Sequence, residues 1–358
     1  MWLHFSIFCS LIILGIIYKP RNKMNRWFYF SILFLLFFVI ASFRAINIGN
    51  DTQEYFRIFR LISSSNSLTI AIGLTRYEIG YITLNYIISR FTSNFSVLLC
   101  LVSAFYLFSV FRFIKKYASK IGIVVILCFT FFMFYDVMNI IRQCISVAIF
   151  LFAIDYLLDR KFVKYFCLII LATFFQSISL VLLLIYFIPK ADFKKAKDLV
   201  KWIFVVVIAL IILGSLSRIV GVVFPYFAHY FTTEYAEGGV RSASLVFFLI
   251  RIGIVVFVWL LGGFRTNQDL DIKSNIFMQM MLLDCLIAGM SISFNILDRI
   301  ENFFCLGYII AISNGITRIK RSNQILADVI IIIFSFIYMT ILLIYRSNWY
   351  GLFPYQFL

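Results

Sequence analysis

Residues 96–114 read SVLLCLVSAFYLFSVFRFI, an apolar run with one basic residue near its end, and Lys115 and Lys116 follow it. As an α-helix, a run of this length matches the roughly 30 Å hydrocarbon core of a bilayer. Because lipid offers the backbone no hydrogen-bond partner, only helices and closed barrels can cross it. The apolar residues are continuous rather than alternating, so the stretch predicts a transmembrane helix.

Similar runs recur along the chain. Hydrophobic residues make up 63% of 358 positions and charged residues 13%, against about 45–50% and 25% in soluble domains. A soluble fold cannot bury so much apolar surface. We therefore predict an all-α, polytopic integral membrane protein with about 12 transmembrane helices. The predicted spans are 2–18, 27–43, 96–114, 121–138, 142–158, 163–176, 177–189, 202–220, 244–261, 275–292, 301–317 and 325–344.

The basic residues set the predicted orientation. Lys and Arg gather in five connections, near residues 19–26, 115–120, 160–164, 190–201 and 318–321, and the positive-inside rule places such connections in the cytoplasm. An even number of crossings then places both termini outside. A crossing at 76–91 would break this parity, so we expect a membrane-dipping or interfacial helix there. The net charge of +16 follows from this topology and does not indicate a nucleic-acid partner.

No linker or internal repeat divides the sequence, so 1–358 is predicted to be a single transmembrane domain. Its outer-face loops are expected at about 44–95, 221–243 and 293–300. The first run has no basic segment before it and no small-residue cleavage site, so we predict a retained span. The seven cysteines show no metal-binding spacing and are expected to be small buried apolar residues.

The first outer loop carries a polar cluster, and its residues 43–55 read FRAINIGNDTQEY. Arg44 can grip phosphate oxygens with two parallel charge-assisted bonds. Asp51 and Tyr55 can bind sugar hydroxyls, and a carboxylate can also take a proton. Ordinary turn chemistry, with Arg44 reaching toward lipid headgroups, explains the same residues equally well.

Arg142 lies between two apolar runs on the side predicted to be poor in arginine. A charge near membrane depth costs about 2.5–3.5 kcal/mol on insertion scales, so it normally faces a partner or a cavity. Asn139 lies three positions earlier on the same helical face, and Gln143 follows directly. A structural pair with Asp136 is the alternative.

Further candidates lie in the other outer segments, and each also has a structural explanation. Arg76 and Glu78 flank Tyr77, and Gln176 precedes a turn where membrane helices often exchange hydrogen bonds. Arg241 belongs to a loop whose aromatic residues also suit an interfacial belt. Asp298 and Arg299 open a predicted span, where acidic residues complement the helix dipole.

Several chemistries are disfavoured. The sequence has no P-loop, dinucleotide fingerprint or HExxH motif, and its two histidines are too few for a histidine-based metal site. Asp269-Leu270-Asp271 has the form of a nucleotide-sugar motif, but it falls in a predicted inner loop with no nucleotide-binding domain around it.

The order of these motifs resembles the Wzy/EpsG-type polymerases of bacterial O-antigen and other surface polysaccharides, best over about residues 40–190. The motifs that carry the resemblance are Arg44…Gly49-x-Asp51…Tyr55, Asn139-x-x-Arg142-Gln143, Asp159-Arg160-Lys161-Phe162 and Ala172-Thr173-Phe174-Phe175-Gln176-Ser177. Gln176 stands where relatives often carry His. Since Gln can bind a hydroxyl but cannot accept a proton at neutral pH, Gln176 is expected to orient a sugar and not to act as a base.

The resemblance implies a membrane-embedded glycosyltransferase of the bacterial inner membrane, with its active site facing the periplasm or exterior. It would transfer a growing glycan from undecaprenyl pyrophosphate to an acceptor hydroxyl on a lipid-linked repeat unit. A chain-length regulator is a candidate partner.

The resemblance also suggests residue roles. Arg142, Arg44 and Arg299 are the diphosphate candidates in that order, and Asp51 is the leading base with Glu78 second. Arginine supplies the positive charge, so no metal or other cofactor is expected. The sugar-orienting candidates are Tyr55, Asn139, Gln143 and Gln176, and the further substrate-binding candidates are Arg76, Asp298 and Arg241.

Two other classes of function stay open. A flippase for lipid-linked oligosaccharides, or another transporter, would favour charges through the full membrane depth and a repeat between halves. A transferase using polyprenyl-monophosphate sugars would need carboxylates in the first outer loop, which Asp51 and Glu54 supply. A membrane O-acyltransferase needs a placed His, and neither His4 nor His229 has supporting spacing.

Overall fold

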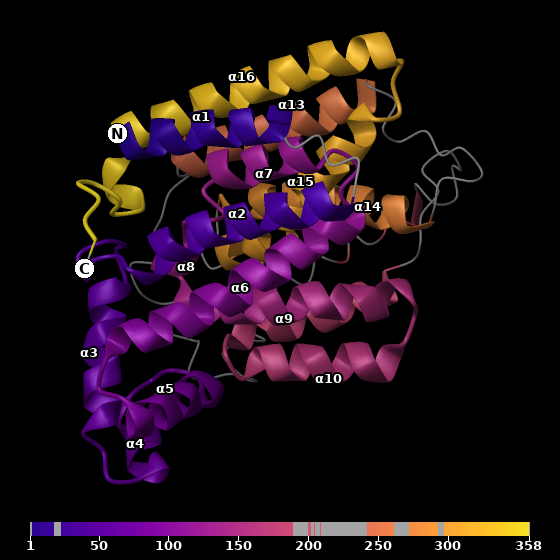
Figure 1. The fold of residues 1–358 in the computed structure, drawn as a ribbon. Coiled ribbons are helices and arrows are strands. Elements are labelled where there is room, and N and C mark those ends of the chain that lie inside the picture. The colour runs from indigo at the N-terminus through magenta and orange to yellow at the C-terminus, as the bar shows by residue number, and fades with distance from the viewer. Residues whose placement is uncertain are drawn as a thin grey trace. The chain divides into compact units, whose positions relative to one another are not determined.

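The computed structural model describes residues 2–17, 23–188, 200–201, 204, 208, 242–260, 272–292 and 297–357. Within these ranges the chain is helical, and its only strand-like pairing is one antiparallel bridge between Arg44 and Phe357. Figure 1 shows the helices in chain order. The predicted all-α class is therefore confirmed.

The helices follow the apolar runs closely. Their bounds are α1 Trp2–Ile17, α2 Lys23–Ser42, α3 Thr52–Ser63, α4 Leu68–Leu74, α5 Ile79–Phe91, α6 Phe95–Tyr117, α7 Ile121–Thr130, α8 Asp136–Asn139, α9 Ile141–Leu158, α10 Phe162–Thr173, η1 Ser177–Phe187, α13 Ser242–Leu260, α14 Ile272–Ser291, α15 Asp298–Ile316, α16 Arg321–Tyr345 and η4 Ser347–Trp349.

Four helices among the described residues are long and apolar enough to cross a membrane: Met24–Ser42, Phe95–Tyr117, Ile141–Leu158 and Arg321–Tyr345. Shorter apolar helices fall on most of the other predicted spans. A polytopic membrane protein is consistent with this pattern, whereas the count of about 12 spans stays a prediction. The predicted span 202–220 lies outside the described residues, apart from single positions.

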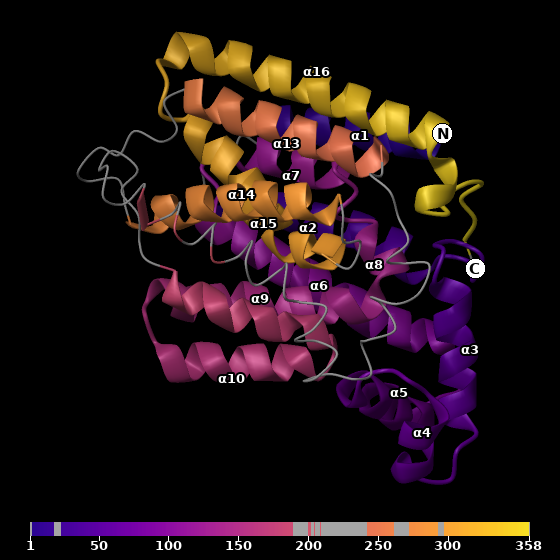
Figure 2. The same cartoon turned by 180° about the vertical axis from the view of Figure 1, so that it is seen from behind.

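The described chain forms two compact units, one of residues 1–183 and 325–358 and the other of residues 184–324. In the first unit α6 packs against α2 and α9, α9 packs against α10, and α1 packs against α7. Figures 1 and 2 both show α9 and α10 lying side by side. In the second unit α14 packs against α13 and α15. The single transmembrane domain stays a prediction.

The predicted span 121–138 differs from the structure. α7 ends at Thr130, so its 10 residues extend only about 15 Å. Phe132 has φ 63°, a conformation that no α-helix accommodates. The backbone then turns through residues 131–135, enters the short α8, and starts α9 at Ile141. Most side chains of this turn are buried in protein, as irregular backbone at membrane depth requires.

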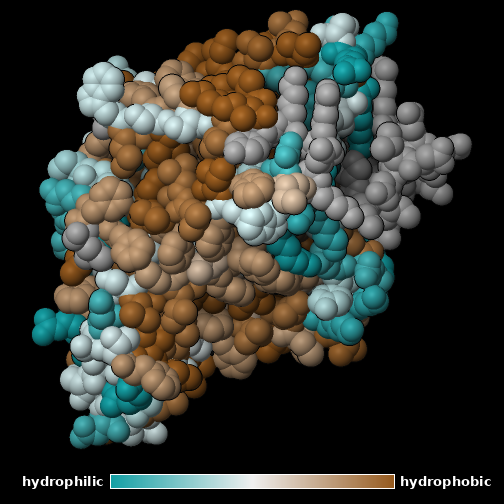
Figure 3. Space-filling view, in the orientation of Figure 1, coloured by the Kyte–Doolittle hydropathy of each residue, from teal (hydrophilic) through white to brown (hydrophobic). Residues whose placement is uncertain are grey.

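The predicted outer loop 44–95 folds into three helices, α3, α4 and α5. Their shared apolar core consists of Ile58, Ile62, Ala71 and Ile82. In Figure 3 polar side chains gather over α3 and α4, in the orientation of Figure 1. α5 matches the helix expected near 76–91, and its 13 residues extend about 20 Å, less than the bilayer core.

Candidate active site

Arg142, in the first turn of α9, is the centre of the polar cluster in the first unit. Its guanidinium forms an ion pair with Glu78, and both side chains are largely buried, at 16% and 14% exposed. The ring of Tyr77 covers the guanidinium at 4.2 Å from its centroid, and the Tyr55 hydroxyl lies within hydrogen-bonding reach. The Nε–H of Arg142 has no hydrogen-bond partner among the described residues. It is therefore a buried donor that an incoming acceptor can satisfy.

Glu78 holds this arginine from the start of α5. One carboxylate oxygen pairs with Arg142, and the other accepts hydrogen bonds from the Ser177 backbone N–H at 3.1 Å and hydroxyl at 3.2 Å. Two residues later, the Gly80 N–H donates to the Phe174 carbonyl at 2.8 Å. A Cβ at Gly80 would lie 2.6 Å from that oxygen, so only glycine allows the approach. Glu78 thus joins α5, α9 and the turn after α10.

Three tyrosines line the α3–α5 side of the cluster. The ring of Tyr55 lies 6.2 Å from that of Tyr77 and 5.7 Å from that of Tyr81. Burial raises the pKa of Tyr55 to about 12 and also raises the pKa of Tyr77. Both phenols are therefore neutral hydrogen-bonding groups at neutral pH and not proton acceptors.

Asp51 stands beside this cluster as an exposed residue directly before α3. Its side chain makes no capping hydrogen bond to the helix. Its charge contributes to the raised pKa values of Tyr55 and Tyr77, which places the carboxylate near both phenols. An exposed carboxylate beside the tyrosines that line the Arg142 cluster is in a position to act as a general base.

Arg44 lies in a different environment from the one expected for a diphosphate ligand. It is fully buried and donates hydrogen bonds to the Ala41, Val137 and Met138 carbonyls and to the Thr52 hydroxyl. Burial lowers its pKa to about 10, so it stays charged at neutral pH. Since its donors point at the protein's own carbonyls, this geometry favours a positioning role. Phosphate binding by Arg44 stays a prediction.

The other predicted site residues differ in burial and in the unit to which they belong. Asn139 is buried and accepts a hydrogen bond from the Asn50 N–H at 2.8 Å. Gln143 and Gln176 are buried, and Arg76 is exposed. Asp298 and Arg299 open α15 in the second unit, and Arg241 lies outside the described residues. Among the described residues no three His, Cys, Asp or Glu side chains gather as a metal site.

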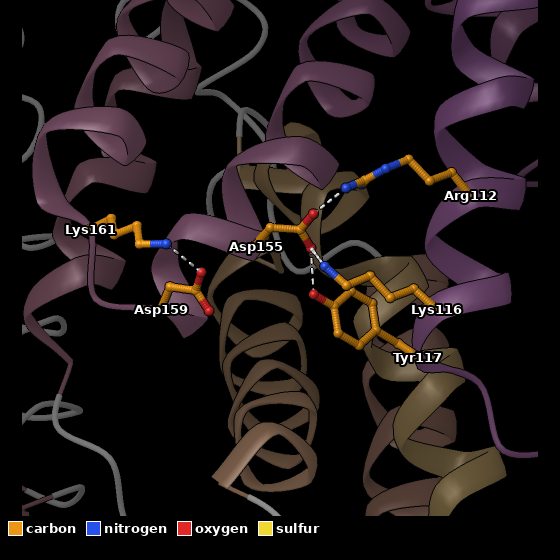
Figure 4. A network of polar contacts seen from close by, with 6 residues as sticks. All are labelled: Arg112, Lys116, Tyr117, Asp155, Asp159 and Lys161. Atoms are coloured by element: carbon orange, nitrogen blue, oxygen red, sulfur yellow. Dashed lines mark hydrogen bonds and ion pairs between the residues drawn. The ribbon is translucent and has the colours of Figure 1, made fainter.

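The predicted site residues do not include Tyr77 and Ser177, although Tyr77 lies between Arg76 and Glu78 and Ser177 follows Gln176. They also leave out two charge clusters inside helices. In Figure 4, Arg112, Lys116 and Tyr117 of α6 point at Asp155 of α9. In the second unit Arg251 pairs with Asp284 at 2.8 Å and Glu301 at 2.5 Å. Charged residues inside apolar runs were the available signal for both clusters.

These features define a class, an α-helical membrane protein with an arginine-centred polar site at one end of its helices. The chain belongs to the EpsG family, whose model matches residues 27–357. This is the family of Wzy/EpsG-type polysaccharide polymerases, which confirms the resemblance predicted from the motifs. No curated protein and no solved structure matches the chain.

Proposed function

We propose that this protein is a polymerase that joins undecaprenyl-pyrophosphate-linked repeat units into O-antigen or capsular polysaccharide at the outer face of the bacterial inner membrane. The observation that carries the proposal is Arg142, a largely buried cation with a donor to spare in a chain of the EpsG family. Arginine suits this role because its fixed donors match phosphate oxygens.

In the proposed reaction, an acceptor sugar hydroxyl attacks the anomeric carbon of the donor glycan. The bond from that carbon to the diphosphate oxygen breaks, and its electron pair leaves with undecaprenyl pyrophosphate. Arg142 stabilises the charge that develops on the diphosphate. Asp51 takes the proton of the acceptor hydroxyl.

The remaining residues orient these two groups. Both oxygens of Glu78 are engaged by Arg142 and Ser177, so we assign Glu78 to positioning Arg142 and keep Asp51 as the base. Tyr55 and Tyr77, neutral at working pH, offer hydroxyls and rings to sugars. The arginine supplies the electrostatic stabilisation, so metal independence stays part of the proposal.

The test is polymerisation by the purified protein in proteoliposomes. The substrate is the host's undecaprenyl-pyrophosphate-linked repeat unit, supplied with a divalent-metal chelator, and the products are separated on a gel. Arg142→Ala is compared with Arg57→Ala. Arg57 is an exposed arginine of α3 that forms a surface ion pair with Glu54. We expect a ladder spaced by one repeat unit from the wild type and from Arg57→Ala.

Arg142→Ala, shown to be inserted and folded, should give no ladder. A wild-type-like ladder from this variant would contradict the assignment of Arg142. If the intact wild type gives no ladder from verified substrate, the polymerase proposal fails. Translocation of the lipid-linked glycan in the same vesicles would then test the flippase alternative.

A further inference from the structure

The segment after α16, residues 346–357, lies against the loop that leads into α3. Two backbone hydrogen bonds join them, from Gly49 N–H to the Gly351 carbonyl and from Ala45 N–H to the Gln356 carbonyl, both at 2.9 Å. The Asn47 side chain adds a hydrogen bond to the Gln356 side chain at 3.1 Å. The two segments are about 300 residues apart in sequence, so this pairing is a tertiary contact specific to the fold.

Asn50 is the residue at which this contact meets the candidate active site. Its side-chain amide donates to the Asn348 carbonyl at 2.9 Å and to the Trp349 carbonyl at 2.7 Å. Its backbone N–H donates to the Asn139 side chain at 2.8 Å. One residue immediately before Asp51 is therefore bound both to the segment after α16 and to the turn that precedes Arg142.

Two glycines allow the close approach. Gly49 has φ 86° and Gly351 has φ 56°, which side chains rarely adopt. A Cβ on Gly351 would lie 2.6 Å from the Asn50 side-chain oxygen, and one on Gly49 would collide with the Met138 carbonyl. Glycine at these two positions therefore allows the loop before α3, the segment after α16 and the backbone at Met138 to approach one another closely.

The segment is also anchored to the helices behind it. The Tyr350 ring stacks on that of Phe132 at 4.6 Å, and the Phe353 ring meets that of His4 at 5.0 Å. Leu352, which lies between these two residues in the sequence, is buried. The Tyr355 hydroxyl donates a hydrogen bond to the Ile40 carbonyl. Since the segment is fixed to α1, α2 and the turn at residues 131–135, it can hold the loop that it contacts.

We propose that the segment after α16 is a positioning element of the active site, with Asn50 as the residue that transmits its position to Asp51. The inference rests on the proposed function. The Asp51 side chain makes no capping hydrogen bond to its own helix, and the residues on either side of Asp51 fix the position of its backbone. Thr52, the residue on its other side, donates to the Met138 carbonyl at 2.9 Å. Asp51 is thus held between two tethered residues.

The test replaces the two amide donors while keeping the side chain's shape, as Asn50→Asp. The Asn348 and Trp349 carbonyls would then face a carboxylate, so the loop around Asn50 should separate from the segment, which stays anchored to the helices behind it. Amide hydrogen exchange at Gly49 and Ala45 should accelerate because their acceptors belong to the segment. With Asp51 displaced by about 1 Å, kcat for polymerisation should fall on the order of 10²-fold, with KM for the lipid-linked unit little changed.

Asn323→Asp is the matched control, since Asn323 is exposed at the start of α16, away from this contact. It should change neither exchange nor kcat. Gln356→Ala serves as a milder second variant that removes only the Asn47 side-chain bond, and it should give a smaller change in the same direction.

Each result decides the inference. Faster exchange at Gly49 with an unchanged kcat would overturn it, because the loop before α3 would then be released from the segment without cost to catalysis. Unchanged exchange in Asn50→Asp would also overturn it, because Asn50 would then not hold the segment. If the wild type itself does not polymerise, the proposed function fails, while the exchange measurement still reports on the tether.

Discussion

The two ends of α9 carry ion pairs that are built in opposite ways. Near the end of the helix, the anion Asp155 is at the centre and receives Arg112, Lys116 at 2.9 Å, and the Tyr117 hydroxyl, all from α6. At the start of the helix, the cation Arg142 is at the centre and is held by Glu78, the residue directly before α5, under Tyr77 and near Tyr55. The first cluster joins two packed helices, whereas the second joins three separate segments.

This difference indicates two different tasks. A carboxylate surrounded by three donors from the adjacent helix is satisfied by the protein itself and fixes how α6 packs on α9. An arginine held from one side by a single carboxylate keeps donor capacity for an anionic ligand. The Asp155 cluster should therefore govern stability, and the Arg142 cluster should govern the reaction.

The largest effect is expected at Arg142. Arg142→Lys keeps the charge but loses the planar set of donors, so kcat for polymerisation should fall by about 10²–10³-fold, as when one donor to a developing anion is removed. Initial rates in proteoliposomes at matched amounts of folded protein measure it. A lysine variant with wild-type kcat would show that charge alone suffices at this end of α9.

A smaller effect is expected from Glu78→Gln. The amide keeps the size of the side chain and can still accept from Ser177, but it loses the charge that holds Arg142. Because hydrogen bonds to charged groups contribute about 1.5–3 kcal/mol, kcat should fall by roughly ten- to hundredfold. If Glu78→Gln abolished activity while Asp51→Asn kept it, Glu78 and not Asp51 would be the base.

At the other end of α9, Asp155→Asn should lower stability instead of specific activity. Arg112 and Lys116 would lose their anion. Because their side chains are 29% and 44% exposed, water replaces part of the lost contact, and the loss of stability should be about 1 kcal/mol. Thermal unfolding in detergent measures the loss, and the rate per folded molecule should equal that of the wild type. A large drop in that rate would remove the distinction between the two ends.

The smallest effect is expected from Tyr55→Phe, which removes one hydroxyl from the Arg142 cluster. Because the pKa of Tyr55 is raised to about 12, this phenol does not titrate near neutral pH. The rate should fall only a few-fold, as expected for about 1 kcal/mol from one neutral hydrogen bond, and the pH profile of kcat between pH 5 and 9 should keep its shape. A shifted profile would show that Tyr55 takes part in the proton transfer.

The sequence predicts the apolar helices and singles out Arg142 as a site candidate, because both leave local signals. A long apolar run and a lone charge at its edge are visible without tertiary contacts. The partner Glu78 is 64 residues away, and no local pattern specifies such a pairing. The sequence offers Asp136 as a nearby structural partner for Arg142, whereas in the structure Arg142 pairs with the distant Glu78.

Other features depend on tertiary context and could not be read locally. Arg44 has the sequence surroundings of a phosphate ligand, but the carbonyls of residues 137 and 138 reach it from another part of the chain. The end of α7 lies in a run of phenylalanines with no proline or glycine at residues 129–134. The turn there is stabilised by packing and not by local propensity.

The central claim is that the lipid diphosphate binds at the Arg142 end of α9. Its most direct test is photocrosslinking in proteoliposomes, with a polyprenyl pyrophosphate that carries a photoreactive group next to the diphosphate, followed by mass-spectrometric mapping. We expect crosslinks in residues 51–55, 77–81 and 139–143, reduced by unlabelled undecaprenyl pyrophosphate and absent in Arg142→Ala. Crosslinks confined to residues 112–120 and 155–161, at the Asp155 end, would contradict the account.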